Sequence, residues 1–138
     1  MIGKHFPEHR EVVRRGIGPA LASGEERLVL AALRSLTNHP DLRPDGLDLR
    51  LLMFAAWPSV RVGALSALLA DDSESAREAS LALTGDSSPY VRRQLVHLAA
   101  HLGNGGDALL RELVNDQDCF VRALARQAIE EEAPASAS

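Results

Sequence analysis

The feature that most restricts how this 138-residue chain can fold is the dipeptide Val-Arg, which recurs at residues 60, 91 and 121. The copies are 31 and 30 residues apart, and apolar residues follow four, seven and eight positions after each Val. This spacing places the apolar side chains on one face of an α-helix. A weaker fourth copy, LVLAALRSL at 28–36, aligns with residues 60–68. A period of about 30 residues predicts a repeat protein built from stacked helix pairs.

Other helices are predicted between these copies. They cover residues 46–56, 73–84 and 106–115, of which the first ends at Trp57-Pro58 and the second begins at Ser73. The short links force neighbouring helices to run antiparallel. A single helix pair cannot bury its apolar face alone, so the stacking of pairs supplies the core. The longest interruption is residues 38–46, which contain two prolines and are expected to form a loop.

Composition supports an all-α fold. Hydrophobic residues make up 46% of the chain but few are aromatic, and a sheet protein would need more β-branched and aromatic residues. Cys119 is the single cysteine, so the chain has no disulfide framework and no cysteine-rich zinc site. The N-terminus lacks the apolar core of a signal peptide, and no apolar run reaches membrane-spanning length. A cytoplasmic protein with no membrane segment is therefore expected.

The pattern Asp-x-x-x-x-Val-Arg resembles the HEAT repeat family, including its PBS-lyase-type variants. It runs from Asp86 to Arg92 and from Asp116 to Arg122. The resemblance implies a short right-handed α-solenoid of about four HEAT-like helix pairs, whose second helices line the concave side. It also implies a ladder of hydrogen bonds between the Asp and Arg of adjacent repeats. Ala55 stands where one Asp should be, so the ladder is expected to break there.

Three regions are expected along the chain. Residues 1–23 form an N-terminal capping region, with a helix at 8–15 that Gly16, Gly18 and Pro19 interrupt. Residues 24–132 form the HEAT-like repeat domain. Residues 133–138 form a disordered tail, because small and polar side chains follow an acidic run.

The family resemblance implies a scaffold rather than a chemistry. On the helix whose expected core positions are 91, 95, 98 and 102, the remaining polar positions point away from the core. With their counterparts in the neighbouring repeats, the residues expected to bind a partner are Ser66, Arg93, Gln94, His97, His101, Arg126 and Gln127. We expect this concave face to bind a peptide or protein through shape complementarity and a few anchors. No catalysis and no cofactor are expected, and the chain is expected to be a monomer or a homodimer.

Two groups of residues allow a different reading. His97 and His101 have the four-residue spacing of a metal pair, but no third ligand lies near them in the sequence, and two ligands rarely make a site. No metal site is therefore expected. Arg61, Arg92 and Arg122 could form a basic row that grips an anion, but the interrepeat ladder is favoured because Arg pairs well with carboxylates.

Two other function classes stay open. One is an accessory or lyase-like subunit of an enzyme system, which a small molecule bound in a pocket would indicate. The other is a nucleic-acid binder that uses the N-terminal basic residues Lys4, Arg10, Arg14 and Arg15. Residues 70–138 carry six basic and twelve acidic side chains, a balance of −6 that opposes phosphate binding.

Overall fold

The computed structural model describes the backbone of residues 7–137 and the side chains of residues 11–103 and 106–131. All regular structure within residues 7–137 is helical, and that range contains no strand, which confirms the all-α prediction. The chain divides into two units, Met1–Asp72 and Ser73–Ser138, called here the N-terminal and the C-terminal unit. Each unit has its own buried apolar side chains and is described by itself.

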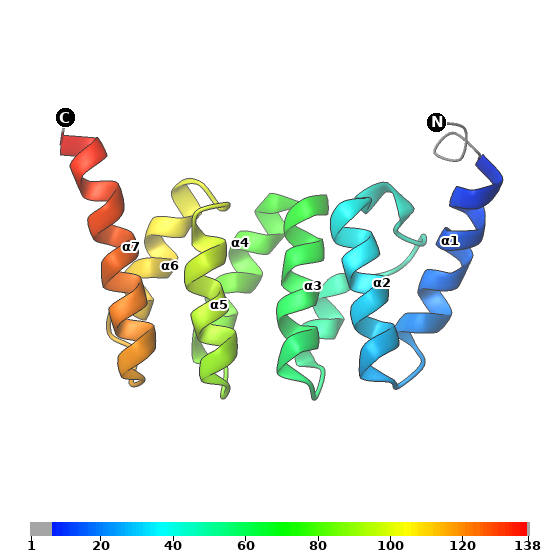
Figure 1. The fold of residues 1–138 in the computed structure, drawn as a ribbon, viewed down its shortest axis with the longest axis horizontal. Coiled ribbons are helices and arrows are strands. Elements are labelled where there is room, and N and C mark those ends of the chain that lie inside the picture. The colour runs from blue at the N-terminus through cyan, green and yellow to red at the C-terminus, as the bar shows by residue number, and fades with distance from the viewer. Residues whose placement is uncertain (1–6, 138) are drawn as a thin grey trace. The chain divides into compact units, whose positions relative to one another are not determined.

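From residue 7 onward, the N-terminal unit contains three α-helices and two 3₁₀ segments. They are α1 (Pro7–Leu21), α2 (Glu26–Asn38), η2 (Pro40–Leu42), η3 (Leu49–Phe54) and α3 (Pro58–Asp71). Helices α2 and α3 lie side by side and run in the same direction (Figure 1). A Cβ on Gly63 would lie 3.2 Å from Leu33 Cδ1, so the missing side chain lets the two helices approach closely. Helices α2 and α3 therefore have the same orientation and pack closely against each other.

Helix α1 is longer than predicted. The sequence predicted a helix at residues 8–15 that ends at the glycines, but the helix continues through Pro19 to Leu21. Burial overrides the weak local propensity, because Ile17 is only 3% exposed and packs inside the unit. Pro19 removes one backbone donor, but helical bonding is present beyond it, since Ala22 N donates to Gly18 O at 3.1 Å.

The prediction of a helix at residues 46–56 is wrong in the type of helix and in its first residue. The structure has a 3₁₀ helix of six residues, Leu49–Phe54. Gly46 has a φ of +81°, which turns the chain out of helical geometry. Asp48 then caps the segment, since its Oδ1 accepts a hydrogen bond from Arg50 N at 3.0 Å. The few residues left before the extended Ala55 are too short for a stable α-helix, whose nucleation is costly.

The Asp48 cap gives a pH-dependent prediction. Hydrogen bonds from the side chain and then the backbone amide of Arg50 hold the pKa of the Asp48 carboxyl below its ordinary 3.8. A lowered pKa means that the cap contributes stability above pH 3.8 and loses it as the pH falls through the folded-state value. Carboxyl ¹³C NMR should show Asp48 titrating below 3.8, and Arg50→Ala should return it toward that value. Titration of the parent at or above 3.8 would show that the cap does not persist in solution.

Over residues 73–137, the C-terminal unit contains four α-helices and one 3₁₀ turn. They are α4 (Ser73–Ala82), η4 (Leu83–Gly85), α5 (Pro89–Ala99), α6 (Asn104–Leu113) and α7 (Cys119–Ala137). Helices α5 and α7 run in the same direction side by side, and α6 runs in the opposite direction behind them (Figure 1). The predicted tail at 133–138 overlaps the end of α7. Its side chains and the whole of Ser138 lie outside the described residues.

Helix α5 buries two stripes rather than one. Val91 and Leu95 are buried as expected, but Leu98 is only half-buried. A second stripe of Arg92, Val96 and Ala99 is also buried, of which the sequence predicted only Ala99. The reason is that α5 contacts α6 and α7 together, so two of its sides are covered. This is the packing of a helix with another helix pair stacked against it.

Candidate functional site

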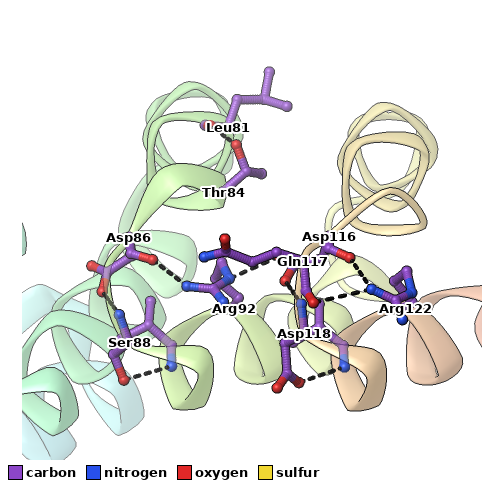
Figure 2. Close-up of polar contacts among 11 residues, drawn as sticks. Leu81, Thr84, Asp86, Ser88, Arg92, Asp116, Gln117, Asp118 and Arg122 are labelled. Carbon is purple, nitrogen blue, oxygen red and sulfur yellow. Dashed lines mark hydrogen bonds and ion pairs between the residues drawn. The ribbon is translucent and has the colours of Figure 1, made fainter.

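In the three repeat copies that contain Val-Arg, the Arg side chain folds back on the loop before its helix. Arg61, Arg92 and Arg122 each donate a hydrogen bond from Nη1 to the carbonyl oxygen six residues earlier. For Arg61 and Arg122 this distance is 2.8 Å, and both also donate to the next carbonyl along. Figure 2 shows this arrangement at Arg92 and Arg122. The three copies of the sequence motif therefore share one local geometry.

A buried ion pair joins two successive copies. Arg92 Nε donates to Asp116 Oδ2 at 2.7 Å, and each side chain is only 5% exposed (Figure 2). The other carboxylate oxygen of Asp116 accepts from Asp118 N at 2.8 Å, so both oxygens are satisfied. This is the Asp–Arg contact that the resemblance implied. Ala55 offers only its carbonyl at the equivalent place.

A hollow of about 260 Å³ opens beside this ion pair. Its lining includes the carboxylates of Asp86, Glu112 and Asp116 together with Arg92. Asp86 Oδ1 accepts from Ser88 N at 2.9 Å, and Arg92 is bonded to the carbonyl oxygen of Asp86 as well as to Asp116. These contacts hold the loops before α5 and α7 together, so the guanidinium group of Arg92 is already paired within the chain.

A second hollow, of about 280 Å³, lies between α5 and α7 and is called here the α5–α7 groove. It is lined by Val96, His97, Ala100, Leu124, Gln127, Ala128 and Glu131. Its lining is thus apolar apart from one imidazole, one amide and one carboxylate. Gln127 Nε2 donates to Glu131 Oε1 at 3.2 Å, which orients two of these polar groups on the same side. A small apolar hollow with a few polar groups is the general form of a recognition site.

The structure brings together only part of the residue set that the sequence predicted. His97 and Gln127 both line the α5–α7 groove. Arg93 is exposed and lies four residues before His97, so it continues the same wall by one helical turn. The remaining predicted residues do not line the groove. Gln94 is on α5, His101 lies in the turn after α5, Arg126 is on α7, and Ser66 is half-buried in the N-terminal unit.

Sequence reasoning missed Phe120. Its side chain is 66% exposed, and it lies four residues before Leu124, so it extends the α7 wall of the groove by one turn. The available signal was that the residue directly before Val-Arg is aromatic in two copies, Tyr90 and Phe120. Tyr90 is also exposed, at 41%. Large exposed aromatic side chains are typical anchors in protein interfaces.

The residues named for the other function classes are engaged or lie outside the described side chains. Arg14 pairs with Asp45 at 3.4 Å and Arg15 with Glu11 at 3.4 Å, so acids already neutralise two of the four basic groups considered for nucleic acid. The side chains of the other two are not described. Within the described residues, no group of three or more His, Cys, Asp or Glu could hold a metal ion.

Two further findings bear on identity. No helix among the described residues has both the length and the apolar character needed to cross a membrane. Cys119 is a free, exposed thiol at the start of α7. In comparisons with known proteins, no family model, no curated protein and no solved structure matches the chain.

Proposed function

We propose that this chain is a non-catalytic binding module, a short right-handed α-solenoid of about four HEAT-like helix pairs, and that it binds a segment of another protein. The α5–α7 groove is the binding surface. The observation that carries this proposal is the groove itself, in which an apolar lining is bordered by side chains with no packing role in the core.

Repetition of local structure supports the solenoid. Val-Arg helices recur with a period near 30, and the Arg of each folds back on the carbonyl six residues before it. In each unit, two such helices or their counterparts lie side by side in the same direction (Figure 1). The Arg92–Asp116 contact joins consecutive copies in the C-terminal unit. Repeat stacking of this kind presents one helix of each pair on a continuous surface.

The occupant that fits the groove best is a short amphipathic helix. Two parallel helices leave a channel into which a third helix can place an apolar ridge, with residues three or four positions apart. Val96 and Leu124 would contact that ridge, while His97 and Gln127 would bond to polar groups beside it. Phe120 would anchor one end, and the exposed Arg93 would select an acidic residue on the partner.

The proposal predicts that two exposed side chains can be removed with loss of binding and no loss of folding. Arg93→Ala combined with His97→Ala should weaken capture of a protein partner by roughly tenfold or more, because one or two anchors carry most interface energy. The tagged chain would be used to capture partners from a lysate of its source, with and without nuclease, and the captured proteins would be identified by mass spectrometry.

The matched control uses neighbouring positions, Gln94 on α5 and His101 in the turn after it, and similar residue types. Gln94→Ala combined with His101→Ala changes one polar residue and one histidine that do not line the groove. This control should retain the partner. Both double variants should have a free energy of unfolding within about 0.5 kcal/mol of that of the parent. Equal retention by both double variants, or equal loss, would contradict the groove assignment. Capture that disappears with nuclease would favour nucleic acid instead.

A further inference from the structure

One side of α7 corresponds in sequence to a side of α5 that other helices cover. The buried second stripe of α5 is Arg92, Val96 and Ala99, and residues thirty positions later in α7 are Arg122, Arg126 and Ile129. On α5 this stripe is covered by the helix pair that follows it. Asp116 bonds to Arg92, Val96 faces α7 across the groove, and the Ala99 carbonyl lies against Gly106 of α6.

The equivalent stripe of α7 has no such cover among the described residues. Arg122 is half-buried, Arg126 is exposed, and Ile129 is 38% exposed. None of the three lines the α5–α7 groove, so this side of α7 is a second surface, called here the α7 end face. The α7 end face therefore has both apolar and cationic character, because it carries a partly exposed Ile and two guanidinium groups.

Arg122 is already held in the orientation that Arg92 uses to bind a carboxylate. Its Nη1 donates to Asp116 O at 2.8 Å and to Gln117 O at 3.0 Å (Figure 2). In Arg92 the same clasp leaves Nε free to donate to Asp116 Oδ2. Within residues 11–103 and 106–131, no hydrogen bond from Arg122 Nε is present. The Nε group that forms the buried contact in Arg92 is therefore available for a partner in Arg122.

We propose that the α7 end face binds a helix pair of a partner protein, with an aspartate of the partner's interhelical loop accepting a hydrogen bond from Arg122 Nε. The Arg92–Asp116 contact is the intramolecular example of the geometry. Arg126 replaces the Val96 of α5, so the partner carries an acidic side chain at that point rather than an apolar one. Two cations four residues apart on α7 select an acidic partner segment, and Ile129 adds apolar contact. This surface is independent of the proposed groove.

A covalent probe tests the face with the full chain. One period of the sequence, residues 100–129, is inserted as a second copy directly after Ile129, and the native residues from 130 onward follow it. The inserted copy supplies a helix pair whose Asp116 is in register with Arg122. In the inserted copy, Leu124 is also changed to Glu, because Leu124 faces Val96 in the native groove and would here face Arg126. The linkage gives the probe a high effective concentration at the face.

The expected result is a longer helical chain that unfolds in one transition, with a midpoint roughly 5 °C or more above that of the parent. Arg122→Gln and, in the inserted copy, Asp116→Asn should each remove part of this gain. The two changes together should cost little more than either alone, because they remove one contact.

Three results would overturn the proposal. The inserted residues could add no helical circular dichroism signal, which would show that the face does not accept a helix pair. The two substitutions could be additive, which would show that Arg122 and the loop aspartate do not interact. The parent chain could associate with itself at high concentration and lose this on Arg122→Gln in sedimentation, which would make the occupant a second copy.

Discussion

Replacing Arg92 with Met should destabilise the C-terminal unit by about 3–5 kcal/mol, the usual cost of removing one partner of a buried ion pair. Both side chains of the Arg92–Asp116 pair are 5% exposed, so the carboxylate left behind would have little access to water. The substitution also removes the bond to the carbonyl oxygen of Asp86, which holds the preceding loop. Urea unfolding followed by circular dichroism measures this loss as a lower midpoint with little change in slope.

Two controls separate burial of charge from loss of the side chain. Arg122→Met removes the same carbonyl clasp at the equivalent position of the next copy, but it leaves no buried carboxylate without its ion-pair partner, so it should cost only about 1 kcal/mol. The double variant Arg92→Met with Asp116→Leu should recover much of the stability lost in the single variant. An Arg92→Met protein as stable as the Arg122→Met protein would show that the Arg92–Asp116 contact does not hold the two copies together.

Gly106→Ala should cost about 3 kcal/mol, at the upper end of overpacking effects. A Cβ at Gly106 would lie 2.1 Å from the carbonyl oxygen of Ala99, and backbone cannot give way as a flexible side chain can. The first turn of α6 would have to move away from the end of α5. Thermal unfolding followed by circular dichroism should show a lower midpoint and an unchanged helical signal at low temperature.

The matched control for this substitution is Gly85→Ala. No atom lies within 4 Å of a Cβ built at Gly85, and its φ is not positive. Alanine there should be neutral or should stabilise the protein by about 0.4–1 kcal/mol, because it restricts the unfolded chain. A Gly106→Ala protein with the stability of the Gly85→Ala protein would mean that α6 does not pack closely on α5 in solution.

Much of the fold was predictable, because helical periodicity and burial agree over the strongest copies. The Val-Arg helices begin and end near the predicted residues, and the predicted helix at 106–115 appears two residues earlier as α6. The errors lie where local and tertiary preferences disagree. Ile17 is buried and carries a helix through Gly18 and Pro19, whereas the turn at Gly46 leaves too few residues for an α-helix before Trp57.

The candidate site was less predictable than the fold. Helical spacing shows which residues point away from a single core face, and it correctly placed Arg93 and His97 on the exposed side of α5. It does not show which residues of a neighbouring helix they meet. Gln127 therefore meets His97 in the groove while Arg126, next to it in sequence, does not. Phe120 was missed because an apolar residue in a helical pattern is ordinarily assigned to the core.

The most direct test of the proposed function is a hydrogen-exchange map of the chain alone and in complex with its captured protein partner. Binding in the groove predicts slower exchange along α5 and α7, centred on the turns that carry Val96, His97 and Leu124. The exposed pair Leu51 and Phe54 of η3 should exchange at the same rate in both samples. Protection confined to η3, with no change along α5 and α7, would contradict the account and place the binding surface in the N-terminal unit.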